Sequence, residues 1–225
     1  MEIYQVNVPP PATSESEKLS RQLHLELADE ARTRLDIVDS ALRNAEGLAP
    51  HFVREICFLQ FRLLCDTIAL LCLIAHGNHS KRLRDTYEAH KIMAELEKLN
   101  PHFYPQPLTV RREGNTVHFE AGLADERHLA KAELIELWGK SGDVLHRAPL
   151  SKLTEPRKAD PQDLSDVYTW AAKIARLLVA YVIPLSETRA LFAFAKHEDT
   201  GKPSIQVLDF STESNTVTVE EFKAS

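Results

Sequence analysis

The chain has 225 residues, 44% of them hydrophobic, which indicates a folded protein with one main domain. Its net charge of −6 argues against a broad electrostatic surface for nucleic acid or anionic lipid, so RNA is a partner that the net charge does not support. Seven glycines are few for this length, which argues against a fold of many strands and turns and favours helices.

The N-terminal part of the chain changes character near residue 17. Residues 1–16 hold three consecutive prolines and then a Ser/Thr/Glu run, which predicts an extended or disordered lead with at most a short strand over 3–8. From Glu17 to about Asn44, apolar residues recur at steps of three and four, as in an amphipathic helix with room for one break. The predicted buried stripe of this helix consists of Leu19, Leu23, Leu27, Ala31, Leu35, Val38 and Leu42.

The most hydrophobic stretch, FLQFRLLCDTIALLCLIAHG, belongs to a second helix that we predict from Pro50 to His76, with Gly77 as its cap. A membrane span would place Arg62 and Asp66 in the hydrocarbon at a cost of about 2.5 kcal/mol or more each. We therefore expect a core helix and no membrane partner.

Compartment and redox state follow from the cysteines and the N-terminus. Three cysteines, Cys57, Cys65 and Cys72, fall in the second helix and predict small buried thiols in a reducing compartment. The N-terminus lacks a basic segment followed by an apolar one, so no secretory signal is expected. Together these features predict a cytoplasmic protein.

The rest of the chain alternates helical patterns with strand patterns. We predict helices over 86–99, capped by Ser80 or Asp85, over 125–146 and over 163–183, an ordered loop over 100–107, a β-hairpin over 108–120, and three C-terminal strands after residue 190.

The predicted fold class is mainly α (α+β), with about five helices in a bundle and a small antiparallel β-sheet built from the hairpin, the C-terminal strands or both. The expected organisation is a lead over 1–16, a bundle over 17–185 with the hairpin inserted near 108–120, and a C-terminal antiparallel meander over 186–225.

Arg62 and Asp66 form a polar stripe on the second helix together with Glu55, because these residues fall within about 40° of one another at 100° per residue. One interpretation is a partly exposed ion pair worth under about 1 kcal/mol. The other is a binding role, in which Asp66 orients a base on a neighbouring helix or binds a ligand cation. The sequence leaves both open.

A second candidate site is LWGKSGDVLHR at residues 137–147. His146 follows Asp143 by three residues on one side of a helix, and Lys140 precedes both, so they could act in acid–base chemistry or contact a phosphate. Alternatively, His146 and Arg147 only place positive charge at a helix C-terminus.

The second helix, the loop NPHFYPQP and the later WGKSGDVLHR together resemble a group of uncharacterised bacterial proteins over roughly residues 50–150. More loosely, long helices with an acidic residue, followed by a helix that ends in a polar-plus-His motif, are similar to HEPN domains. Some HEPN proteins are ribonucleases that need no metal and that dimerise to join two motifs, each of an Arg and a His with four to six residues between them.

The HEPN resemblance implies specific residues of this chain. Arg84 and His90 match the motif, whereas Lys140 and His146 have its spacing but carry Lys in place of Arg. The resemblance implies that the histidine would help to activate a ribose 2′-hydroxyl and that the arginine would stabilise phosphate charge.

No metal and no cofactor is predicted, because His76, His79 and His90 complete no known ligand spacing. Our leading hypothesis is a helical binding protein that acts as a homodimer or with a protein partner, with a cleft near Arg62, Asp66 and His146. The alternative is a HEPN-like metal-independent ribonuclease that acts as a toxin or defence effector.

Overall fold

The fold was obtained as a computed structural model that describes residues 14–44, 47–77, 83, 85–86, 88–113, 116–121, 127–146, 163–197, 200–211 and 216–223. These ranges form five helices and one antiparallel sheet, so the predicted α+β class with mainly helical content is confirmed. The helices are α1 (Glu15–Arg43), α2 (Pro50–His76), α4 (Ala89–Leu99), α5 (Lys131–Leu145) and α7 (Ser165–Val179). The strands are β1 (Gln106–Glu113), β2 (Thr116–Ala121), β3 (Ala180–Pro184), β4 (Arg189–Phe194), β5 (Ser204–Ser211) and β6 (Thr216–Lys223).

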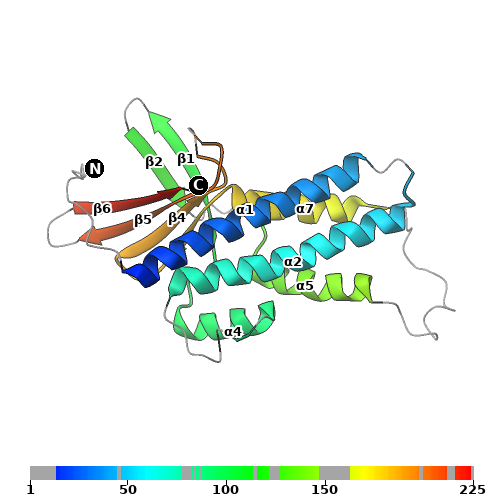
Figure 1. The fold of residues 1–225 in the computed structure, drawn as a ribbon, viewed down its shortest axis with the longest axis horizontal. Coiled ribbons are helices and arrows are strands. Elements are labelled where there is room, and N and C mark those ends of the chain that lie inside the picture. The colour runs from blue at the N-terminus through cyan, green and yellow to red at the C-terminus, as the bar shows by residue number, and fades with distance from the viewer. Residues whose placement is uncertain are drawn as a thin grey trace.

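The helices α1 and α2 lie side by side along the long axis of the molecule, with α5 against the other side of α2 (Figure 1). A capping box starts α1, in which Ser14 and Glu17 exchange hydrogen bonds of 3.2 Å between side chain and backbone N–H. As predicted, α2 starts with Pro50 and ends before Gly77, whose φ of 68° suits glycine. The predicted break in α1 is not observed.

The apolar helix α2 is the core helix of the bundle. It is long and apolar enough to cross a membrane, but 67% of its most apolar window is buried inside the structure. Cys57, Cys65 and Cys72 are buried and free, as expected, and burial raises the pKa of the Cys57 thiol to about 11. Burial likewise raises the pKa of the other two thiols, so all three are poor nucleophiles.

The sheet has the strand order β2-β1-β3-β4-β5-β6, and all its pairs are antiparallel. The predicted hairpin and the predicted C-terminal strands therefore belong to one sheet. Alternate residues of β3 face opposite sides: Tyr181 and Ile183 join the main core, while Val182 joins a second cluster with Phe192 and Leu208. The ring of Phe119 in β2 lies 5.3 Å from that of Phe192, so the hairpin curls toward this second cluster.

Three predicted helix boundaries are wrong. The helix predicted over 163–183 ends at Val179, because residues 180–184 alternate between two buried faces and pair with β1 and β4. The helix predicted over 86–99 begins at Ala89, since Thr86 is in a turn closed by a 3.2 Å hydrogen bond to the Leu83 carbonyl. The predicted cap Ser80 and residues 1–13 of the lead predicted over 1–16 lie outside the described residues, whereas the last residues of that lead, Glu15 and Ser16, belong to α1.

The third wrong boundary is the start of the helix predicted over 125–146, which begins at Lys131 as α5. The preceding residue Ala130 has extended backbone, and the backbone N–H of Leu129 before it donates to the Lys173 carbonyl at 3.1 Å. A residue fixed to α7 in this way cannot continue α5 backward.

The predicted buried stripe of α1 is wrong over its first three turns. Leu19 and Leu23 are 58% and 39% exposed, whereas Arg21 and His24 are buried. The side of α1 that carries Arg21 and His24 faces the sheet, since His24 bonds to Tyr181 of β3. This rotation decides which side chains line the cavity described below.

Candidate functional site

The predicted pair Arg62 and Asp66 is built around Trp138 of α5. The indole Nε1 of Trp138 donates to Asp66 Oδ1 at 2.8 Å, and Arg62 Nη1 donates to the Trp138 carbonyl at 2.8 Å. The Arg62 guanidinium also lies 3.2 Å from the centre of the Trp138 ring, in a cation–π arrangement. The distance between Arg62 Nε and Asp66 Oδ2 is 4.0 Å, at the limit of an ion pair.

Asp66 also holds the start of α4. The backbone N–H of Ala89, the first residue of α4, bonds to the Asp66 carboxylate, and the cap residue Glu88 makes no side-chain cap of its own. Burial raises the pKa of Asp66, while the Trp138 hydrogen bond, Arg62 and Ala89 act in the opposite direction. Asp66 therefore ties α2 to α4 and α5, which is a structural use of its charge.

His90 lies on the same tryptophan. Its ring is 4.9 Å from that of Trp138, centre to centre, and its Nδ1 is buried without a hydrogen-bond partner. The structure thus brings together Arg62, Asp66 and His90. Arg84, the predicted partner of His90, lies outside the described residues.

Lys140 is in an ion-pair cluster near the start of α2. Its Nζ lies 2.9 Å from Asp166 Oδ2, and Arg54 donates two hydrogen bonds of 2.6 and 2.7 Å to the same carboxylate. Burial raises the pKa of Asp166, but the hydrogen bonds from Arg54 and Lys140 outweigh it and hold the pKa at about 2. The amino group of Lys140 is thus engaged with α7.

Asp143 and His146 are exposed at the end of α5. His146 comes eight residues after Trp138, a separation of about 12 Å along the helix at 1.5 Å per residue. The predicted cleft of Arg62, Asp66 and His146 is therefore not assembled at Trp138. No described contact joins His146 to Lys140 or Asp143.

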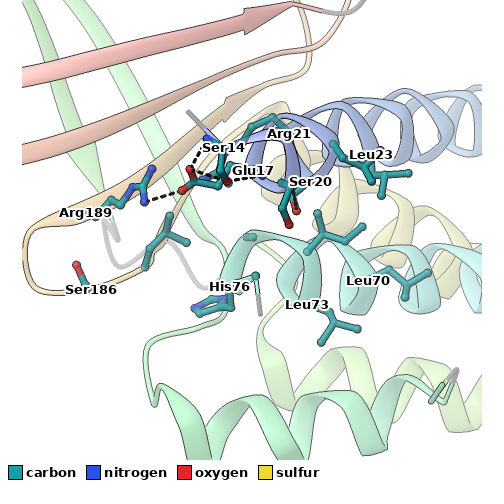
Figure 2. A pocket seen from close by; sticks show the side chains of 16 residues that line it. Ser14, Glu17, Ser20, Arg21, Leu23, Leu70, Leu73, His76, Ser186 and Arg189 are labelled. Atoms are coloured by element: carbon teal, nitrogen blue, oxygen red, sulfur yellow. Dashed lines mark hydrogen bonds and ion pairs between the residues drawn. The ribbon is translucent and has the colours of Figure 1, made fainter. Parts of the chain in front are cut away.

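The structure has a cavity of about 1020 Å³ where the start of α1, the end of α2 and the turn between β3 and β4 meet (Figure 2). Its lining is Ser14, Ser16, Glu17, Leu19, Ser20, Arg21, Leu23, Leu70, Leu73, Ile74, Ala75, His76, Gly77, Leu185, Ser186 and Arg189. This volume is at the upper end of the range of about 300–1000 Å³ that is usual for small-molecule sites. None of the predicted site residues lines it.

Polar and apolar groups occupy different parts of this cavity. Figure 2 shows Ser14, Glu17 and Arg189 gathered near the first turn of α1, whereas Leu23, Leu70 and Leu73 lie further along the helices. The exposed Leu19 and Leu23 belong to the wall that α1 contributes. The cavity is amphipathic, with a charged end and a leucine-rich end.

Glu17 and Arg189 neutralise one another at the charged end. Arg189 Nη1 lies 3.2 Å from Glu17 Oε1, and Arg189 Nε lies 3.3 Å from Asp209 Oδ1. The hydrogen bond from the Ser14 backbone lowers the pKa of Glu17, and Arg189 lowers it as well. Burial acts in the opposite direction and raises this pKa. Glu17 therefore closes the capping box of α1 and holds the β3–β4 turn at the same time.

Arg21 has no such partner. It is only 4% exposed, its Nε has no hydrogen bond, and no carboxylate of the described residues lies within ion-pair distance of its guanidinium. Burial lowers the pKa of Arg21, as does Arg189, while Glu17, Glu220 and Asp209 raise it through space. Arginine nevertheless stays charged in proteins, so the cavity wall contains a buried cation that the described chain leaves unpaired.

His24, one turn beyond Arg21, is a buried neutral group. Its Nε2 lies 2.9 Å from the Tyr181 hydroxyl, and its Nδ1 has no hydrogen-bond partner. Burial, together with the charge of Arg21, lowers the pKa of His24 to about 3. A second positive charge beside Arg21 is thereby avoided.

Sequence reasoning missed Arg21 because the leucines of α1 dominated the helical pattern. A weak signal was present: Arg21, His24, Ala28, Ala31 and Leu35 also repeat at three- and four-residue steps. That stripe is less hydrophobic than the leucine stripe and could not be preferred without knowing that α1 contacts a sheet.

Comparisons with protein families, with curated proteins and with solved structures find no match for this chain. The resemblances to HEPN domains and to a bacterial group stay predictions. In the part of the chain that the structure describes, no three His, Cys, Asp or Glu side chains are grouped to hold a metal ion.

Proposed function

We propose that the protein acts by binding a small ligand in the cavity between α1, α2 and the β3–β4 turn. The observation that carries this proposal is the buried guanidinium of Arg21 in the wall of a cavity of about 1020 Å³, where its Nε has no hydrogen bond and no described carboxylate forms an ion pair with it. Leaving a buried charge without a partner costs several kcal/mol, so a group at this place is expected to have a use in a bound state.

The cavity supports this proposal better than the residues predicted from the sequence do. The polar groups of Asp66, Trp138 and Lys140 are taken up by contacts within the chain. Satisfied polar groups of this kind hold helices together and leave little capacity for a ligand. Among the described residues, no contact joins the acid–base residues of the ribonuclease alternative. A homodimer is a separate prediction that this proposal does not require.

The proposal is tested with Nile red, a neutral apolar dye whose emission rises on leaving water. We expect the wild-type protein to increase the emission and Leu23→Trp to abolish the increase, because Leu23 lines the cavity and a larger ring fills it. The matched control is Leu59→Trp, since Leu59 is a leucine of similar exposure, 44%, that does not line the cavity.

Two results would contradict the proposal. One is the absence of any emission change with the wild-type protein. The other is an equal response of Leu23→Trp and Leu59→Trp, which would place the dye elsewhere. Thermal unfolding of both variants, followed by circular dichroism, checks that each is folded.

A further inference from the structure

We propose that the protein forms a homodimer in which the outer sides of α1 and α2 from two copies pack against each other as an antiparallel four-helix bundle. This inference goes beyond the proposed function and does not rest on it. It comes from apolar side chains of α1 and α2 that the core of a single copy leaves partly exposed.

The helix α2 has an apolar stripe on its outer side as well as on its core side. Six of its side chains fall within about 60° of one another at 100° per residue, and none of them is fully buried: Phe52, Ile56, Leu59, Leu63, Leu70 and Ile74. Phe52 and Leu59 are 50% and 44% exposed. An exposed apolar stripe of this length marks a contact with another surface.

The adjacent side of α1 continues this stripe. It carries Leu19, Leu23, Leu27 and Ile37, with Glu30 and Arg34 between them, all within about 80°. Arg34 donates to Gln60 of α2 at 3.1 Å, so the outer sides of the two helices adjoin. None of the described elements crosses in front of α1 and α2 in Figure 1. We call this combined surface the α1–α2 face.

The size of the α1–α2 face matches that of a stable dimer interface. The 27 residues of α2 span about 40 Å at 1.5 Å per residue, and two packed helices are about 20 Å wide. The face therefore offers about 800 Å² per copy, which is the usual contribution of one partner to a specific protein–protein interface.

The charges in the middle of the face favour a second copy of the same chain. A two-fold axis that crosses α1 near residue 32 makes the α1 helices of the two copies antiparallel. Glu30 of each copy then lies level with Arg34 of the other, and the Glu30–Arg34 pair within each copy becomes part of a network of four alternating charges. A lipid surface fits less well, because it would place these charges against hydrocarbon.

The same axis brings the apolar parts of the face together. Residue 34 of α1 lies beside residue 60 of the antiparallel α2, so the axis crosses α2 near residue 62. Phe52 of one copy then lies level with residue 72 of the other, between Leu70 and Ile74. Because Leu70 also lines the leucine-rich end of the cavity, the second copy would close that end and leave the charged end open.

Sedimentation equilibrium of the full chain tests the dimer. We expect a particle of twice the chain mass of 25.4 kDa, with a Kd of about 1 μM or below. Leu59→Glu should weaken dimerisation about 100-fold or more, because the two-fold axis buries the new charge twice. Ile135→Glu is the matched control and should keep the wild-type Kd, since Ile135 is 40% exposed on α5, outside the face. Circular dichroism checks that both variants are folded.

Exchange of the central charges tests the two-fold geometry. Arg34→Glu places four negative charges at the axis and Glu30→Arg places four positive ones, so each variant alone should dimerise about 10-fold more weakly than the wild-type protein. An equimolar mixture of the two variants should form heterodimers about as tightly as the wild-type protein dimerises, because each glutamate then meets an arginine.

Four results would each overturn the inference. The first is a wild-type protein that stays monomeric at about 100 μM. The second is a dimer whose Kd does not change in Leu59→Glu, and the third is a mixture of the two charge variants that does not associate. The fourth is a monomeric wild-type protein that binds phosphatidylcholine vesicles, which would assign the face to a membrane. Nile red binding by Leu59→Glu tests the cavity without the dimer, so failure of this inference is distinguishable from failure of the proposed function.

Discussion

Two arginines in the helices of this protein have opposite surroundings. Arg62 of α2 is partly exposed, yet it stacks on Trp138 at 3.2 Å, donates to a carbonyl at 2.8 Å and lies beside Asp66. Arg21 of α1 is more deeply buried and has none of these contacts with the described residues. Of these two arginines, the more buried one therefore has fewer partners in the described part of the chain.

The comparison distinguishes two uses of charge in a helical core. At Trp138 the polar groups saturate one another and join α2, α4 and α5, so the cluster contributes to stability. At Arg21 a cation is buried at the edge of a cavity without an ion-pair partner among the described residues, which destabilises the fold. A local destabilising feature of this kind is typical of a binding site. Substitutions in the first region should therefore lower stability, and substitution of Arg21 should not.

The largest expected effect is that of Asp66→Ala. This change removes the acceptor of Trp138 Nε1 and of the Ala89 N–H and leaves Arg62 without its carboxylate, so the free energy of unfolding should fall by about 3 kcal/mol. Urea denaturation measures it. Glu55→Ala, an exposed change on the same helix, is the control and should cost under about 0.5 kcal/mol.

The next effect is a pH dependence from His24. Its pKa is about 3 in the folded protein and about 6.5 when unfolded, so below pH 6.5 the unfolded state binds more protons and stability falls. Between pH 6.5 and pH 5 the loss should be about 1.6 kcal/mol, because the slope reaches 1.36 kcal/mol per pH unit only where the unfolded-state histidine is fully protonated.

Denaturant unfolding at several pH values, with two variants, tests this assignment. His24→Gln should flatten the curve over that interval, whereas His51→Gln should not, because His51 is exposed. A slope that survives in His24→Gln would assign the pH dependence to another group.

A direct test of the comparison substitutes methionine for each arginine. Arg21→Met removes an unpaired buried charge and should raise the free energy of unfolding by about 1 kcal/mol in the absence of ligand. Arg62→Met removes a cation–π contact and a hydrogen bond and should lower it by about 1 kcal/mol. Changes of the same sign in the two variants would remove the distinction between the two regions.

The smallest effects are expected for the residues predicted from LWGKSGDVLHR. Lys140→Met should cost about 0.5 kcal/mol, because Arg54 still binds Asp166 in its absence. His146→Ala should change stability by less than about 0.5 kcal/mol, since the side chain is exposed at the end of α5. RNA cleavage by the wild-type protein that His146→Ala abolishes would instead support the HEPN alternative.

Much of the fold could be predicted because local signals were strong. The helix α2 begins at Pro50 and ends before Gly77, as expected. The alternation of apolar and polar residues on either side of residues 114–115 and after residue 190 predicted strands that are observed. The strand β3 could not be predicted, because its three buried and two partly buried residues directly continue an amphipathic helix and look like one more turn of it.

The site was harder to predict than the fold. A role of Asp66 toward a neighbouring helix was one of two interpretations that the sequence left open, and its partner, Trp138, depends on how α2 and α5 pack. The surroundings of Arg21 depend on tertiary structure still more, because they are formed where α1, α2 and the sheet meet. Helical periodicity shows which residues share a face and does not show what that face meets.

The junction between α7 and β3 has a consequence for anyone who divides this chain. The helix ends at Val179 and the strand begins at Ala180, with no linker between them, and the Val179 carbonyl accepts a hydrogen bond from Ala195 N–H at 3.0 Å. A truncation that separates the bundle from the sheet would cut through a continuous element. In hydrogen exchange, the last turn of α7 and the amides of β3 should open together, as one cooperative unit.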